Sequence, residues 1–113
     1  MTVTPRSIEQ RLIELEGAID HAYEYMAKME IAYQDAKTAY ELGMARSRTA
    51  PTEDKRTEKM KEDYALLSNQ PEYEEMMAAY GLVKGARGNL ERLRVQVDIT
   101  RSLGATLRAA LEM

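Results

Sequence analysis

The sequence has no cysteine, no tryptophan and no phenylalanine, and it has a single histidine, His21. The absence of cysteine excludes a disulfide framework and any thiolate chemistry. The aromatic share of 6% consists of tyrosines alone. So little aromatic bulk suits a helical protein with a narrow apolar seam better than a thick globular core. With 113 residues, the chain is long enough for one domain with a modest core.

Patterns that carry enzyme chemistry are also missing. A helical two-metal site needs repeated Glu-x-x-His pairs, which one histidine cannot supply, and His21 falls on the solvated side of its predicted helix. The segment GLVKGARG, residues 81–88, has neither the dinucleotide nor the phosphate-loop spacing. No nucleophile and base can be paired. We therefore expect a non-enzymatic protein without catalytic residues, metal ligands or cofactors.

Long apolar runs are absent as well. No stretch is long enough to span a membrane, and no signal-peptide pattern opens the chain. We therefore expect a cytoplasmic protein without a membrane partner.

The first half of the chain carries an apolar seam with alternating steps of four and three residues. Its members are Ile8, Leu12, Leu15, Ile19, Ala22, Met26, Met29, Tyr33, Ala36 and Tyr40. This heptad spacing predicts a long coiled-coil-like helix over about residues 7–43, with Gly43 as its stop.

A second seam follows in the last third of the chain. Its members are Met76, Ala79, Val83, Ala86, Leu90, Leu93, Val97, Thr100, Gly104, Leu107 and Leu111. Within it, Leu93, Val95, Val97 and Ile99 also alternate as in a half-buried strand. The helical spacing matches more residues and no turn signal bounds a strand, so we predict a second long helix over about residues 71–112.

The region between the seams, about residues 44–70, is predicted to be a joint with a shorter helix. Pro51 interrupts helical continuity, and Thr52 is suited to cap the new helix. Pro71 then opens the last helix. The predicted fold is all-α, a single domain of residues 1–113 in which two long antiparallel coiled-coil-like helices flank a shorter helix and a basic joint.

Arginines recur at every seventh position of the last helix and indicate a register for the hairpin. If Leu12 and Leu90 take heptad position a, these arginines take position e and face the e residues of the first helix. The predicted pairs are Glu9 with Arg108, Glu16 with Arg101, Tyr23 with Arg94 and Glu30 with Arg87. In the same register Leu15 lies opposite Gly104, Tyr33 opposite Ala86 and Tyr40 opposite Ala79. The stripe is thus interpreted as mainly structural.

Several large apolar residues lie outside the seams, on the outer side of the hairpin. Either the middle helix covers them, or other subunits do, or they are scattered surface residues. We expect a homo-oligomer, with the C-terminal helix as the assembly surface. The predicted oligomerisation residues are Val95, Ile99, Leu103, Leu107 and Leu111.

The joint carries the densest basic run in the chain, six Lys and Arg residues between Arg46 and Lys61, flanked by Tyr40 and Tyr64. Basic groups interleaved with aromatic rings suit single-stranded nucleic acid, because charge follows the phosphates and rings stack on bases. The alternative is a solvated, salt-bridged helix, since acidic residues lie among the basic ones. The predicted contact residues of the run are Arg46, Arg48, Lys55, Arg56, Lys59 and Lys61.

Three stretches resemble the UvsY-type phage recombination mediators: AKTAYELG before the joint, EKMKEDYALLS after it, and ITRSLGATLRA in the last helix. The resemblance covers roughly residues 22–111. It implies an oligomeric protein that binds single-stranded DNA and helps to load a RecA-like recombinase onto strands coated with single-strand-binding protein, in the host cytoplasm if a phage encodes it. The family's basic pair before the joint has one counterpart, Lys37, whereas Asp35 takes the other position.

The competing hypothesis is a coiled-coil structural or adaptor protein that binds only protein partners.

Overall fold

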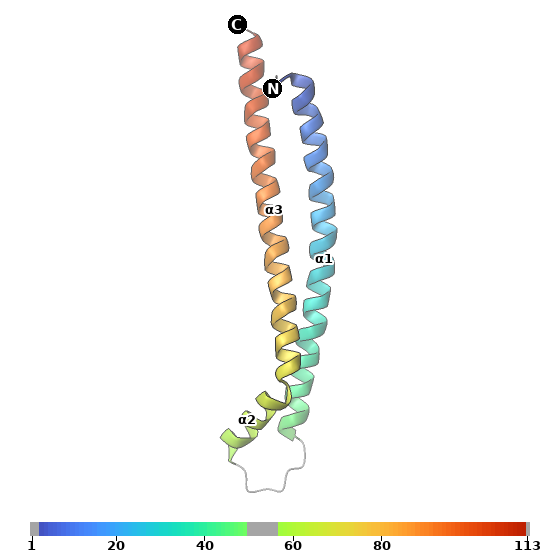
Figure 1. Ribbon diagram of the computed structural model, residues 1–113, viewed down its shortest axis with the longest axis vertical. Coiled ribbons are helices and arrows are strands. Elements are labelled where there is room, and N and C mark those ends of the chain that lie inside the picture. Colours follow the sequence, from blue (N-terminus) through green and yellow to red (C-terminus); the bar gives the residue numbers. More distant parts are fainter. Residues whose placement is uncertain (1–2, 50–56, 113) are drawn as a thin grey trace. The chain divides into compact units, whose positions relative to one another are not determined.

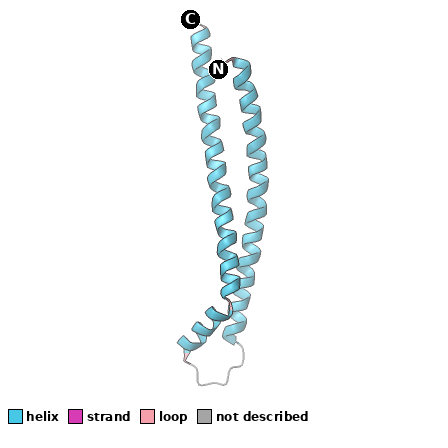
Figure 2. Cartoon of the chain, in the orientation of Figure 1, coloured by secondary structure: helices cyan, strands magenta, loops and turns pink. Residues whose placement is uncertain are grey.

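The computed structural model describes residues 3–49 and 57–112 (Figure 1). Within these residues the backbone forms three α-helices and no strand (Figure 2). The helices are α1 (Pro5–Thr49), α2 (Glu58–Ser68) and α3 (Gln70–Leu111). The long helices α1 and α3 pack against each other and run in opposite directions. The predicted all-α fold is confirmed, and the stretch from Leu93 to Ile99 is helical rather than extended.

The helix ends follow from local capping. Helix α1 begins at Pro5 because Thr4 caps it: the Ser7 N–H donates to Thr4 Oγ1 at 3.1 Å, and the Thr4 N–H donates to Ser7 Oγ at 2.9 Å. Helix α2 is capped by Thr57, whose Oγ1 accepts the Met60 N–H at 3.2 Å. Thr52, the predicted cap, lies outside the described residues.

The end of α1 differs from the sequence-based expectation. Gly43 does not stop the helix, which continues to Thr49. Arg46 and Arg48 therefore stand in the last turn of a helix and not in a joint. Basic groups at this end also complement the partial negative charge of the helix terminus.

The chain divides into two compact units. We call the first the terminal unit: it comprises the chain up to Ala27 together with the chain from Gly85 onward. The second, from Lys28 to Lys84, is the corner unit, which holds α2 and the adjoining parts of α1 and α3.

The terminal unit has the core that the seams predict. Leu15, Ala22, Leu90 and Leu93 are buried together, and four half-buried side chains pack against them. Those four are Ala18, Ile19, Met26 and Val97. All but Ala18 are seam residues, so the heptad pattern correctly identifies the apolar interface of this unit.

The corner unit is held by more specific contacts. The ring of Tyr33 lies 5.3 Å from that of Tyr80 between centroids, and Tyr40 lies 5.6 Å from Tyr73. Between α2 and α3, the side chain of Asn69 is only 6% exposed. Its Nδ2 donates to the Ala65 carbonyl at 2.7 Å and to Ser47 Oγ at 2.9 Å, so one amide group ties α1 to the end of α2.

The predicted pairing of core residues is wrong by about one heptad. Gly104 faces Ile8 and not Leu15: a Cβ added at Gly104 would lie 3.3 Å from Ile8 Cγ2. In the corner unit, Tyr33 meets Tyr80 where Ala86 was expected, and Tyr40 meets Tyr73 where Ala79 was expected.

The reason is that a slip of seven residues keeps every seam residue in the seam, so the repeat itself cannot select a register. Features that do not repeat must select it. Gly43 is one, because a side chain there would overlap Oδ1 of the buried Asn69.

None of the described helices combines the length and the apolar character that a membrane span requires.

Candidate nucleic-acid interface

The predicted DNA contacts that the structure describes all belong to the corner unit. They are Lys37, Arg46 and Arg48 on α1, and Lys59 and Lys61 on α2. Lys55 and Arg56 lie outside the described residues. The fold thus brings residues from two helices into one compact unit, although Lys37 is half-buried whereas Arg46 and Lys59 are exposed.

Arg48 is already engaged by an acidic residue of α2. Its Nε donates to Glu62 Oε2 at 2.9 Å and its terminal nitrogen donates to Glu62 Oε1 at 2.7 Å, a bidentate pair. These hydrogen bonds hold the pKa of the Glu62 carboxyl below its usual value. The same bonds, followed by the Glu62 charge and, less strongly, the Tyr40 phenol, raise the pKa of Arg48. Both groups are therefore charged at neutral pH, and each offsets the other.

The remaining cations differ in whether an acidic group lies within ion-pair distance of them. Lys61 lies 3.7 Å from Glu58 one turn earlier on α2. Among the described residues, Lys37, Arg46 and Lys59 have no acidic group within ion-pair distance. Of the two readings of the basic run, the salt-bridged helix therefore describes Arg48 and Lys61, while Lys37, Arg46 and Lys59 stay available to an anion.

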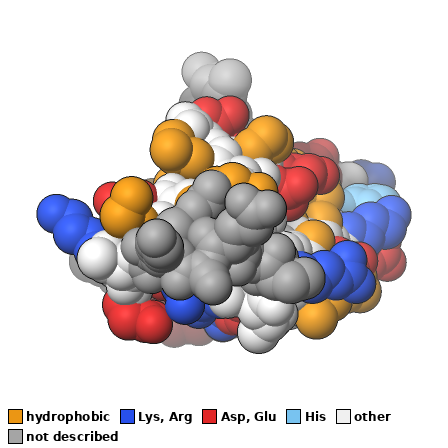
Figure 3. Space-filling view, turned by 90° about the horizontal axis from the view of Figure 1, so that it is seen from below, with side chains coloured by type: hydrophobic (Ala, Val, Ile, Leu, Met, Phe, Trp, Pro, Cys, Tyr) orange, Lys and Arg blue, Asp and Glu red, His pale blue; other side chains and the backbone are white. Residues whose placement is uncertain are grey.

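The charged groups do not form one continuous basic area on the face seen in Figure 3. Basic, acidic and hydrophobic side chains of the described residues are interspersed there. An anion would therefore be bound at separate points and not along an unbroken track.

Two tyrosines and part of α2 surround a shallow hollow in the corner unit. Its lining residues are Tyr40, Leu66, Leu67, Gln70 and Tyr73, and its volume is about 360 Å³. Tyr40 was expected near the basic run, but Tyr73 was not. Only the observed register places Tyr73 opposite Tyr40, so the register predicted from the sequence could not identify Tyr73.

The arginine stripe of α3 forms only part of the predicted ladder. Arg94 donates a hydrogen bond to the Tyr23 hydroxyl, and its guanidinium lies 5.5 Å from the centre of the Tyr23 ring, so this pair is confirmed. No ion pair joins Glu9 to Arg108 in the described chain. The pairing of Glu30 with Arg87 stays a prediction.

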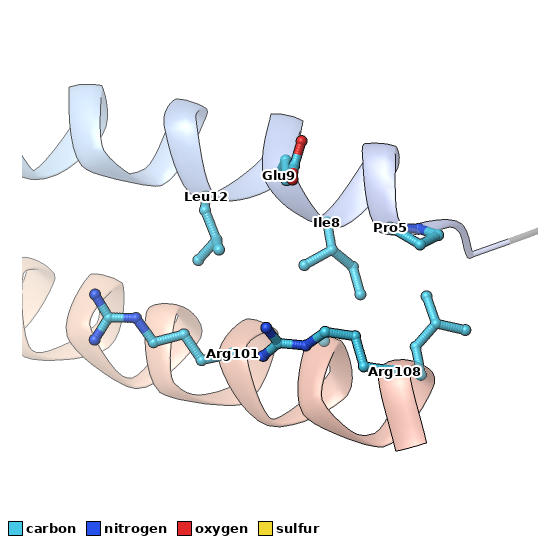
Figure 4. Close-up of a pocket in the computed structure, with 8 residues that line it drawn as sticks. Pro5, Ile8, Glu9, Leu12, Arg101 and Arg108 are labelled. Carbon is cyan, nitrogen blue, oxygen red and sulfur yellow. The ribbon is translucent and has the colours of Figure 1, made fainter. Parts of the chain in front are cut away.

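The last two arginines have a different environment. Arg101 also forms no ion pair with Glu16 among the described residues. Instead, Arg101 and Arg108 line a cavity of about 160 Å³ between α1 and α3, beside Ile8 and Leu12 (Figure 4). Glu9 lines the same cavity, so the acidic residue predicted for Arg108 lies nearby but forms no ion pair with it among the described residues.

Most of the predicted oligomerisation residues are exposed on α3. The exposed fractions are 48% for Val95, 55% for Ile99, 53% for Leu103 and 66% for Leu111. Leu107 is different, since it is half-buried and lines the cavity beside Ile8. Four of the five are thus available to a partner.

His21 is exposed. Among the described residues, no group of three or more His, Cys, Asp or Glu side chains could hold a metal ion.

No known protein family, curated protein or solved structure matches the chain.

Proposed function

We propose that the chain is a non-enzymatic recombination mediator that binds single-stranded DNA and helps to load a RecA-like recombinase, as its resemblance to the UvsY-type mediators suggests. The observation that supports this most directly is the gathering of five predicted contact residues in the corner unit. They lie on the unit that also carries the hollow beside Tyr40 and Tyr73. Cations that share a surface with an exposed aromatic ring, as Tyr73 is here, are typical of proteins that bind single strands with little sequence preference.

The experiment is a binding titration with a fluorescein-labelled oligothymidylate at two salt concentrations. Affinity falls with salt, with a log–log slope of about −0.7 for each phosphate neutralised. Arg46 and Lys59 form no ion pair with the residues that the structure describes, and reversing both charges weakens binding and flattens that slope. The matched control reverses Arg6 and Arg92, which are exposed and lie in the terminal unit; it changes net charge equally and leaves the slope unchanged.

The second candidate function is a coiled-coil adaptor that binds only protein partners. It is favoured by the exposed apolar residues of α3, such as Ile99 and Leu103, and by the net charge of −3. Absence of DNA binding by the parent protein even at low salt would select this candidate. A mass measurement in the same solutions reports whether the chain forms the homo-oligomer that both candidates allow.

A further inference from the structure

The hollow in the corner unit exposes apolar surface that the described residues leave uncovered. Leu67 is 72% exposed, Leu66 is 46% exposed and Tyr73 is 45% exposed. Helix α2 buries only Ala65 among its own residues. Two adjacent leucines directed away from the core, next to an exposed aromatic ring, are unfavourable in water and are suited to an apolar ligand group.

The geometry of the two rings favours a flat ligand. Tyr40 and Tyr73 are tilted by 59° with centroids 5.6 Å apart. At this tilt the rings do not stack face to face, so the exposed Tyr73 keeps a face for another planar group. Gln70 adds an amide at the edge of the hollow, where it now donates to Glu74 Oε1 at 3.3 Å. A side-chain amide both donates and accepts, which suits the polar edge of a heterocycle.

Two cations of α1 lie before and after Tyr40, which lines the hollow. Lys37 precedes Tyr40 by about one turn, and Arg48 follows Tyr40 by about two turns. The rise along the helix from Lys37 to Arg48 is roughly 16 Å, longer than a single nucleotide. A single strand that places one ring in the hollow therefore needs its neighbouring nucleotides to reach both cations.

We propose that the hollow receives one unstacked nucleobase of a single strand, which stacks on Tyr73 while phosphates of the neighbouring nucleotides contact Lys37 in one direction along the strand and Arg48 in the other. This inference rests on the proposed function. It predicts a preference for single strands, because a base paired and stacked in a duplex cannot enter. It also assigns a role to Glu62, which holds Arg48 in place until a phosphate replaces its carboxylate.

The test compares oligothymidylate with an abasic oligomer of the same length and charge. Stacking of one base contributes about 1–3 kcal/mol, so the parent protein binds oligothymidylate roughly 5- to 150-fold more tightly. The variant Tyr73→Leu loses most of that advantage and binds both oligomers alike. The matched control is Tyr25→Leu, because Tyr25 is 47% exposed but belongs to the terminal unit, and it keeps the advantage.

Two further measurements guard against a folding artefact. Leu67→Gln changes a side chain that is 72% exposed, so it preserves helicity while it removes apolar surface from the hollow and lowers the base-dependent advantage. A single 2-aminopurine in the oligomer reports stacking by its quenched fluorescence, which the parent shows and Tyr73→Leu does not. If the parent binds DNA but Tyr73→Leu and Leu67→Gln keep the full base-dependent advantage, the hollow is not a base site and the proposed function stands. If the parent binds neither oligomer at low salt, the proposed function fails first.

Discussion

The two units of this chain are stabilised in different ways. The terminal unit relies on a repeating apolar seam in which Leu15 and Leu90 are buried among similar residues. The corner unit relies on contacts that occur once, such as the amide of Asn69 and the ion pair between Arg48 and Glu62. Both units bury apolar residues, Val83 in the corner unit among them, but the corner unit adds contacts that occur once and can therefore fix which residues pair.

The largest expected effect is the loss of a buried seam residue from the terminal unit. Leu15→Ala removes a side chain that is 1% exposed, and it lowers the free energy of unfolding by about 2–5 kcal/mol because a cavity remains. The control is Ile13→Ala, since Ile13 is 63% exposed, and it changes stability by no more than about 0.5 kcal/mol. Urea denaturation followed by circular dichroism measures both. Equal effects of the two substitutions would contradict the seam as the source of stability.

A smaller effect on stability is expected when a glycine in each unit is replaced by alanine, which adds a single methyl group. Gly43→Ala destabilises by about 1–3 kcal/mol, because the new Cβ overlaps the Asn69 side chain, whose hydrogen bonds resist displacement. Gly17→Ala meets open space in the terminal unit and stabilises α1 by up to about 1 kcal/mol. Thermal melting of both variants shows whether each substitution raises or lowers stability. A stabilising Gly43→Ala would remove the argument that this glycine helps to select the register.

The smallest effect concerns DNA binding at the end of α1. Glu62→Gln removes the carboxylate that a phosphate must otherwise displace from Arg48, so the affinity for single strands rises a few-fold at a given salt concentration. Asp63→Asn is the matched control: it removes the same charge from an exposed neighbour that forms no ion pair among the described residues. Salt titrations measure the DNA affinity of both variants. An equal gain in affinity would show that only the net charge of the protein affects DNA binding.

The pH dependence of the same pair has a defined sign. The folded-state pKa of Glu62 lies below its ordinary value of 4.5, so the ion pair contributes stability above that pH and loses it as the pH falls through the lowered folded value. Glu62→Gln abolishes this acid-dependent component. The gain in DNA binding by Glu62→Gln is therefore to be measured at neutral pH, where the parent ion pair is intact.

The sequence predicts the helices and the core more fully than it predicts the site. A seam that repeats every seven residues identifies Leu15 and Leu93 as core residues whatever their partners are. It does not identify the partner of Gly104, because a slip of one heptad preserves the pattern. Nor does it reveal that Glu62 engages Arg48, since that contact joins two different helices and belongs to no repeat.

The buried Asn69 has a consequence for the order in which the chain folds. Its bond to Ser47 closes a loop of 22 residues, whereas Ile8 and Gly104 are separated by far more of the chain. The entropy lost on closing a loop grows with its length, so the corner forms at lower entropic cost than the meeting of the distant ends. Once Asn69 has bonded to Ser47, contacts between α1 and α3 form first near this bond and then progressively toward the chain ends. A heptad slip, which costs the seam little, would require this first contact to be broken.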